Sequence, residues 1–248
     1  MHRPIRLLTD RLGDGPAPDS AVSRAILERV AAGEIGETLR IFVPHRMVAF
    51  GRRDVVHPRY PEAAAAARRA GFAPIERLAG GIAAVFHEAT LAFAWAVPEP
   101  RPRETIRARF SVLAEIVVEA LAALGVDARI GQVPGEYCPG DFSVNAGGRR
   151  KIMGVGQRLV AGAAHVGGVV VVDDIELTNR ALDAVYGALG YSWDPAATGA
   201  IALEVATTMT EAQQALIEAF AARFTLEDSE IDQATLRLAG TMQGASNR

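Results

Sequence analysis

The hydrophobic and polar positions of the chain follow two periods, one typical of helices and one typical of strands. Apolar residues three and four apart form one face in the segment that holds Ile106, Phe110, Leu113 and Val117. Such spacing predicts helices over residues 20–32, 61–70, 104–124, 179–189, 210–224 and 229–238. Runs rich in β-branched and aromatic residues predict strands over residues 39–43, 73–78, 83–86, 91–97, 142–146, 152–159 and 164–172.

The predicted strands come in adjacent pairs rather than in strict alternation with helices. This order predicts an α+β fold with a mixed, largely antiparallel sheet flanked by helices. We expect residues 1–195 to form one domain and residues 196–248 to form a short C-terminal helical extension packed on it. In that extension, Thr210-Glu211-Ala212-Gln213 has the spacing of a capping box and predicts the start of a helix.

Composition narrows the class of protein. Half of the 248 residues are apolar, which is enough for a sizeable core. The formal charge is −3 and no basic cluster is longer than Arg149-Arg150-Lys151, so we expect no binding to nucleic acid. No apolar run reaches the roughly 18 residues needed to span a bilayer, and the first residues lack a signal-peptide pattern. We therefore expect a cytoplasmic protein that does not enter a membrane.

Two residue types that the chain uses once lie close together in the sequence. Lys151 is the only lysine among 26 basic residues, and Cys138 is the only cysteine. A single ammonium among arginines indicates a position that needs a compact cation, which a planar guanidinium cannot replace. The lone thiol is either a small buried hydrophobe or a reactive group, and the lysine could also be a chance residue on a basic turn.

Three glycine-containing stretches are candidates for binding a ligand. Gly80-Gly81 follows a predicted strand, Cys138 precedes Pro139-Gly140, and Lys151 opens a strand that carries Gly154 and Gly156. Glycine allows a close approach of the backbone to a ligand, and a strand with alternating glycines has one face without side chains. The alternatives are a tight hairpin turn for the glycine pair, an inert buried thiol, and a close crossing of strands or helices.

Together these stretches resemble the lipoate-protein ligase and octanoyltransferase family, which shares a catalytic core with the biotin protein ligases. The resemblance lies in the order Arg77…Gly80-Gly81…His87, then Asp141-Phe142-Ser143-Val144, Lys151…Gly154…Gly156-Gln157 and His165…Gly167-Gly168. It implies that residues 1–195 form a biotin/lipoate ligase-like catalytic domain with a tunnel for a lipoyl or octanoyl chain. The substrate-binding residues that it implies are Arg77, Gly80, Gly81, His87, Gly154, Gly156, Gln157, His165 and Gly167.

The segment Tyr137-Cys138-Pro139-Gly140-Asp141 is similar to the cysteine-dependent octanoyl-[GcvH]:protein N-octanoyltransferases. The similarity implies catalysis through a thioester on Cys138, with the ammonium of Lys151 stabilising the thiolate and the developing oxyanion. It also implies acceptor lysines on lipoyl domains, namely the glycine-cleavage H protein and the E2 subunits of 2-oxoacid dehydrogenases. Such a reaction needs no cofactor and no metal.

Two other functions fit the same residues. One is an ATP-dependent lipoate-protein ligase core that uses ATP and magnesium, in which Cys138 would be incidental and Lys151 would bind the adenylate. The other is a lipoyl-binding relative without catalytic activity. His87 and His165 are candidates for acid–base catalysis, although a histidine at a strand end is also commonly a hydrogen-bonded structural residue.

Overall fold

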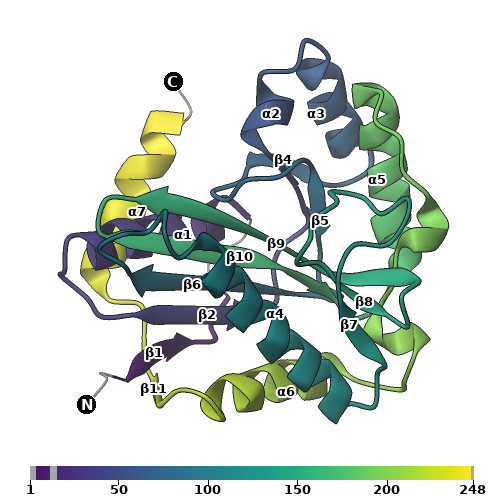
Figure 1. Ribbon diagram of the computed structural model, residues 1–248. Helices are drawn as coiled ribbons and strands as arrows, with labels where there is room; N and C mark the ends of the chain where they lie inside the picture. The colour runs from purple at the N-terminus through teal and green to yellow at the C-terminus, as the bar shows by residue number, and fades with distance from the viewer. Residues whose placement is uncertain (1–3, 12–15, 247–248) are drawn as a thin grey trace.

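Two sheets form the framework of the protein (Figure 1). The computed structural model describes residues 4–11 and 16–246. The larger sheet has the strand order β11-β1-β2-β6-β10-β9-β8-β7, and the smaller one has the order β4-β3-β5. The strands are β1 (Ile5–Leu8), β2 (Thr38–Phe42), β3 (Met47–Phe50), β4 (Ala73–Glu76), β5 (Ala84–Phe86), β6 (Thr90–Pro98), β7 (Ala128–Ile130), β8 (Val144–Ala146), β9 (Arg150–Val160), β10 (Ala163–Val171) and β11 (Leu226–Asp228).

The pairing of the strands confirms the predicted mixed, largely antiparallel sheet. From β2 through β6, β10, β9 and β8 to β7 every neighbouring pair is antiparallel, whereas β1 pairs in parallel with both β2 and β11. In the β9–β10 hairpin, Gly156 lies opposite Gly167 and Gly154 lies opposite Val169. The glycine-rich strand that carries Lys151 therefore lies in the middle of the sheet.

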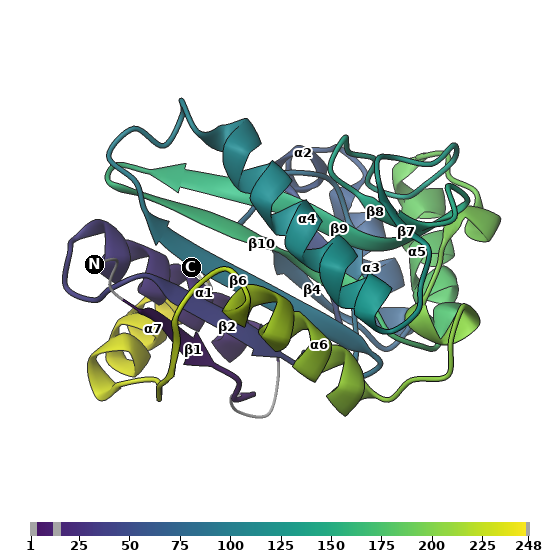
Figure 2. The same ribbon diagram turned by 60° about the horizontal axis from the view of Figure 1, so that its bottom comes forward.

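One face of the larger sheet is covered by α4 (Ile106–Ala123) and α6 (Met209–Ala221), which run side by side across it (Figure 2). The large side chains of Leu91, Phe93 and Trp95 from β6 belong to the core formed with these two helices. The segment after residue 195 thus supplies both α6 and the edge strand β11 to the main sheet.

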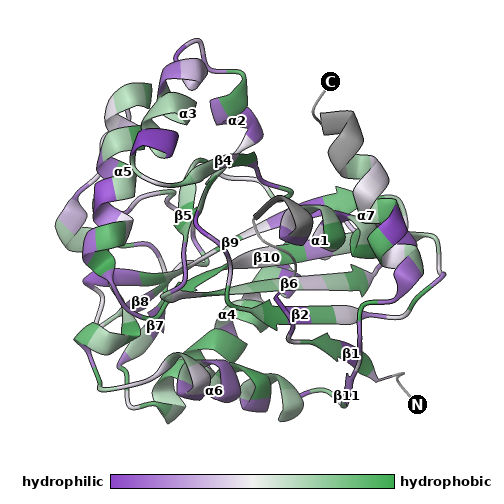
Figure 3. Cartoon of the chain, turned by 180° about the vertical axis from the view of Figure 1, so that it is seen from behind, coloured by the Kyte–Doolittle hydropathy of each residue, from purple (hydrophilic) through white to green (hydrophobic). Residues whose placement is uncertain are grey.

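The opposite face is covered in two parts. Helices α1 (Pro16–Ala31) and α7 (Gln233–Ser246) cover one half, and the smaller sheet with α2 (Arg52–Val55), α3 (Tyr60–Arg69) and α5 (Ile175–Leu189) covers the other (Figure 1). Two short 3-10 turns, η1 (Pro195–Ala197) and η2 (Ile201–Leu203), connect α5 to α6. Figure 3 shows hydrophobic residues concentrated in the strands between these layers. In the described part of the chain, no helix has both the length and the apolar character to cross a membrane.

The structure corrects one predicted helix start. The capping box of α6 is formed by Thr208 and Glu211, not by Thr210 and Gln213. Thr208 Oγ1 accepts a hydrogen bond from the Glu211 amide, and the Glu211 carboxylate accepts one from the Thr208 amide. Both pairs have the required spacing, but Gln213 instead donates to the carbonyl of Ile41 in β2.

Candidate functional site

Cys138 lies in the loop between β7 and β8 with an uncommon backbone conformation. Its φ is +41°, and among the described non-glycine residues only Asp174 shares a positive φ. The Sγ atom accepts a hydrogen bond from the backbone N–H of Ile82 at 3.4 Å and lies 3.8 Å from Nη1 of Arg77. The backbone N–H and the guanidinium can both stabilise negative charge that develops on this partly exposed sulfur.

The ammonium of Lys151 lies beside the same loop, but its hydrogen bonds are already used. Nζ donates to Cys138 O at 2.7 Å, to Tyr137 O at 2.9 Å and to Glu136 Oε1 at 3.0 Å. An ammonium has three N–H donors, so none is left for an acyl carbonyl in this arrangement. Burial lowers the pKa of Lys151, while the charges of Cys138 and Glu136 act in the opposite direction. The structure therefore places Lys151 as a support of the cysteine loop rather than at an oxyanion.

The partner of Lys151 is a buried carboxylate that the sequence analysis missed. Oε1 of Glu136 also accepts hydrogen bonds from Ser143 Oγ at 2.6 Å and from the Gly140 amide at 3.2 Å, and Oε2 accepts from the Val133 amide at 2.9 Å. These donors lie on both sides of Cys138 in the sequence. Glu136 thus fixes the start and the end of the loop that presents the thiol. No motif in the sequence marks it.

The predicted glycines allow a loop to cross a strand closely. A Cβ on Gly156 would lie 2.7 Å from the carbonyl oxygen of Gly80, whose amide donates to the Gln157 carbonyl of β9 at 3.1 Å. Gly81 has φ +108°, and a Cβ there would lie 3.0 Å from Cys138 Sγ. These glycines bring the segment that carries Ile82 against the sulfur. The glycines expected to line a tunnel thus form a close crossing of a loop over a strand. Gly154 likewise lies against Lys151, where a Cβ would be 3.2 Å from Cε.

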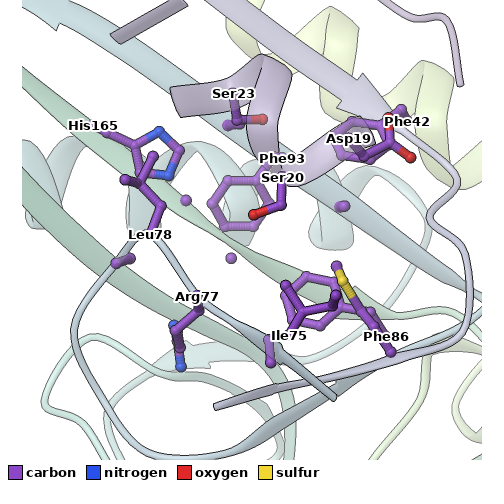
Figure 4. A pocket seen from close by; sticks show the side chains of 17 residues that line it. Asp19, Ser20, Ser23, Phe42, Ile75, Arg77, Leu78, Phe86, Phe93 and His165 are labelled. Carbon is purple, nitrogen blue, oxygen red and sulfur yellow. The ribbon is translucent and has the colours of Figure 1, made fainter. Parts of the chain in front are cut away.

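An apolar cavity lies between the sheet, α1 and the segment that leads to the glycine pair (Figure 4). Its cavity volume is about 80 Å³, within a wider hollow of about 580 Å³ that includes space open to solvent. Among its lining residues are Phe42, Met47, Ile75, Leu78, Phe86, Ala92, Ala94 and Gly168, with Asp19, Ser20 and Ser23 contributed by α1. Three residues predicted for substrate binding, Arg77, His165 and Gly167, also line it. Arg77 therefore connects the cavity to the thiol of Cys138.

His165 points into this cavity from β10 (Figure 4). Burial lowers its pKa to about 4, and the positive charges of Arg77 and Arg40 act in the same direction, so the ring is neutral at pH 7. A Cβ on Gly167 would lie 2.4 Å from His165 Nε2, so the glycine provides the space that the ring occupies. A neutral imidazole in this place can contact a ligand but carries no charge.

His87 is not among the residues that line this cavity. Its Nδ1 accepts from the Ala89 amide at 3.2 Å, so Nε2 carries the proton and donates to Thr178 Oγ1 at 2.8 Å. Burial lowers the pKa of His87. Both ring nitrogens are hydrogen-bonded, so His87 joins the end of β5 to α5. This is the structural role given above as the alternative to acid–base catalysis.

The side chain of Gln157 also lies away from the cavity. Its Oε1 accepts from Arg109 Nε at 3.0 Å and its Nε2 donates to the Ile106 carbonyl at 2.9 Å. Both partners belong to α4, on the other face of the sheet from α1 and the cavity. The Gln157 side chain therefore fixes the first turns of α4, and only the backbone carbonyl of this residue contacts the glycine loop, by accepting from the Gly80 amide.

A pattern in β6 could have revealed the cavity from the sequence. In residues 91–96, large and small side chains alternate as Leu-Ala-Phe-Ala-Trp-Ala. The alternation gives the cavity the small side chains of Ala92 and Ala94 and directs Leu91 and Trp95 to the α4 side, while Phe93 belongs to that core and also lines the cavity. No such pattern in the sequence marks α1 as a wall of the cavity. None marks Tyr186 either, whose hydroxyl accepts from the Cys138 amide at 3.0 Å.

Comparisons with known proteins identify similar sequences. Residues 16–221 match the family model of the lipoyl protein ligase A/B catalytic domain. The chain is 28% identical over 170 residues to an octanoyl-[GcvH]:protein N-octanoyltransferase of Geobacillus kaustophilus, which covers 67% of this chain and 60% of the relative. It is 29% identical over 161 residues to the protein of the same description in Anoxybacillus flavithermus, covering 63% and 58%.

The fold also matches solved structures. A T. acidophilum protein assigned as a lipoate protein ligase, solved with bound lipoic acid, superposes with a TM-score of 0.78 at 21% identity. The match covers 98% of this chain and 96% of that one. By contrast, the alignments with the two octanoyltransferases span about 60% of the relatives' own length.

Proposed function

Because the chain belongs to the lipoyl protein ligase A/B catalytic domain family, we propose that it transfers an octanoyl or lipoyl group to a lysine of a lipoyl-domain protein through a thioester on Cys138. One observation carries this proposal. Arg77 lines the apolar cavity and also lies 3.8 Å from Cys138 Sγ. An acyl chain in the cavity would thus end with its carbonyl near the only thiol of the chain.

In the proposed reaction, the Cys138 thiolate attacks the carbonyl of an acyl group held in amide linkage on a carrier lysine. The bond between Sγ and the acyl carbon forms as the bond to the carrier nitrogen breaks, and that nitrogen takes up from solvent the equivalent of the proton that the thiol released on ionising, so the carrier leaves as an amine. The amine of an acceptor lysine then attacks the thioester carbonyl. The carbon–sulfur bond breaks, and Cys138 regains a proton from the incoming nitrogen.

The surrounding residues have separate roles in this reaction. The Ile82 N–H and the Arg77 guanidinium stabilise negative charge on the sulfur. Lys151 donates to the backbone carbonyl of Cys138, and holding this loop in place is the role we propose for it. The apolar walls hold the hydrocarbon chain and keep water away from the thioester. No nucleotide is needed at any step, because acyl groups in amide and thioester linkage exchange directly.

The donor and acceptor follow from the relatives. Two of them are named for octanoyl transfer involving GcvH, so we propose a glycine-cleavage H protein as one carrier. The E2 subunits of 2-oxoacid dehydrogenases are proposed acceptors because they present a lysine on the same kind of domain.

The test is the intact mass of the protein after incubation with an octanoylated carrier without nucleotide. Wild type should gain the mass of one octanoyl group that hydroxylamine removes, and Cys138→Ser should gain none, because a serine hydroxyl stays protonated near neutral pH. An unmodified wild type that lipoylates only with ATP and magnesium would favour the ligase. An unmodified wild type without activity under either condition would favour a relative that only binds lipoyl groups.

A further inference from the structure

The backbone of Cys138 is held in a conformation that a non-glycine residue rarely adopts. With φ at +41°, the residue lies in the left-handed region, which costs free energy unless the surroundings enforce it. Two side chains contact its main chain. Lys151 Nζ donates to its carbonyl oxygen at 2.7 Å, and Tyr186 Oη accepts from its amide at 3.0 Å. The second contact comes from α5, 48 residues further along the chain.

The hydroxyl of Tyr186 connects the cysteine to the segment that contacts the sulfur. While accepting from the Cys138 amide, it donates to the carbonyl oxygen of Ala83 at 2.9 Å. Ala83 directly follows Ile82, whose N–H points at Sγ from 3.4 Å. A single oxygen atom thus sets the distance between the thiol and its backbone donor.

The position of the Tyr186 ring is fixed by its neighbours. The side chain is 1% exposed and makes edge-to-face contacts with Tyr191 and Trp193, at centroid distances of 5.5 and 6.0 Å. Burial raises the pKa of Tyr186 well above its usual value, so the hydroxyl keeps its proton and can continue to donate. A neutral, immobile hydroxyl is well suited to positioning and poorly suited to proton transfer.

We propose that Tyr186 is a positioning residue that holds Cys138 in its left-handed conformation with the sulfur against the Ile82 N–H. This inference rests on the proposed function, since it assigns the hydroxyl a role in forming the acyl-cysteine. It predicts that the loss of one oxygen atom, without loss of the ring, slows the attack of the thiol.

The test compares Tyr186→Phe with Tyr191→Phe as the matched control. The Tyr191 hydroxyl donates to Asp54 Oδ1 at 2.9 Å, and its ring packs on the same tyrosine without touching Cys138. Rates of Cys138 acylation by octanoylated carrier and of alkylation by iodoacetamide are measured across pH 6–9, at a temperature where circular dichroism shows each variant folded. We expect Tyr186→Phe to slow both reactions by roughly 10- to 100-fold with an unchanged half-saturating donor concentration, and Tyr191→Phe to stay within about threefold of wild type.

The outcomes separate this inference from the proposed function. Acylation and alkylation of Tyr186→Phe at wild-type rates would overturn the role of Tyr186 and leave the thioester mechanism in place. A wild type that is never acylated would overturn the mechanism, and the ratio of alkylation rates would still decide the positioning role. If Tyr186→Phe does not fold, hydrogen exchange in wild type decides the question, because unprotected exchange of the Cys138 amide would contradict the bond to Tyr186.

Discussion

The ammonium of Lys151 lies 3.0 Å from the carboxylate of Glu136, and neither side chain is accessible to solvent. A buried pair of this kind is costly to break, because removing one partner leaves an uncompensated charge. Glu136 belongs to the loop that presents Cys138, and Lys151 holds that loop from β9. Breaking the ion pair should therefore also change the position of the thiol. Its contribution to folding and its contribution to activity can be measured separately.

Lys151→Met should lower the free energy of unfolding by about 3–5 kcal/mol, because Glu136 is left buried and unpaired. The double variant with Glu136→Gln should lose less than the sum of the two single variants, since it removes both charges. Urea unfolding followed by circular dichroism measures all four proteins. Strict additivity of the two changes would show that the ion pair is not coupled in solution.

Lys151→Arg should reduce octanoyl transfer by at least about 100-fold. The planar guanidinium keeps the charge, but in the space of a compact ammonium it cannot donate at once to the oxygens of Glu136, Tyr137 and Cys138. The assay is transfer from octanoylated carrier to a lipoyl domain. Near-native transfer by the arginine variant would mean that any cation suffices at this position.

Arg77→Met should slow the alkylation of Cys138 by iodoacetamide at pH 7 by roughly tenfold, because no other cation lies within hydrogen-bonding range of the sulfur among the described residues. A suitable control is Arg107→Met, since Arg107 is highly exposed and stacks on Phe142 instead. Equal alkylation rates for Arg77→Met and wild type would assign stabilisation of the thiolate to the Ile82 N–H alone.

Ala94→Leu should close the cavity to long chains while leaving Cys138 reactive. The larger side chain takes up cavity space beside Gly167, the cross-strand partner of Ala94, so a long acyl chain is displaced and should react roughly 10- to 100-fold more slowly. Acylation by p-nitrophenyl octanoate should fall by that factor, whereas acylation by p-nitrophenyl acetate should change less than about threefold. A parallel fall with both esters would place the acyl chain somewhere other than in this cavity.

Gly156→Ala should disturb the crossing of the glycine loop over β9. The new methyl group would lie 2.7 Å from the Gly80 carbonyl oxygen, so the loop must move and carry Ile82 away from the sulfur. Gly36→Ala is the matched control, because a Cβ there meets no atom within 4 Å. We expect acylation of Cys138 to fall roughly tenfold in the first variant only. Equal rates in the two variants would show that the loop position does not control the thiol.

His165 should make the stability of the protein depend on pH. Its pKa is lowered from 6.5 to about 4 by burial, so between these values the unfolded chain binds a proton that the folded chain does not. The free energy of unfolding should therefore decrease as the pH falls from 6.5 to 4, by about 3 kcal/mol from this residue. His165→Gln should flatten this part of the plot of unfolding free energy against pH relative to wild type. The contribution of His87 remains in both proteins. Identical profiles would place the imidazole in contact with water.

The sequence alone was enough to predict the long elements and to single out two residues, Lys151 and Cys138, that the fold brings together. Most of the predicted helices and strands lie within a few residues of their observed positions, because an apolar face that repeats every 3.6 or 2 residues must be buried. The last helix, expected over residues 229–238, instead extends from Gln233 to Ser246. The short strands β1, β7 and β11 were missed, since three or four residues carry too little pattern and are fixed by pairing with a neighbour. Lys151 and Cys138, which their scarcity marked as candidates, are neighbours in space.

Only the tertiary structure decided what each residue contacts. Lys151 was expected at an acyl carbonyl, and the fold surrounds its three donors with the oxygens of the cysteine loop. Gln157 faces α4 because side chains alternate along β9. The face of the sheet on which its side chain lies therefore depends on the register of the strands. The partner of the thiol, Arg77, and the positioning hydroxyl of Tyr186 are 61 and 48 residues away from Cys138 in sequence. Contacts over such separations arise from the packing of whole elements, and no local spacing specifies them.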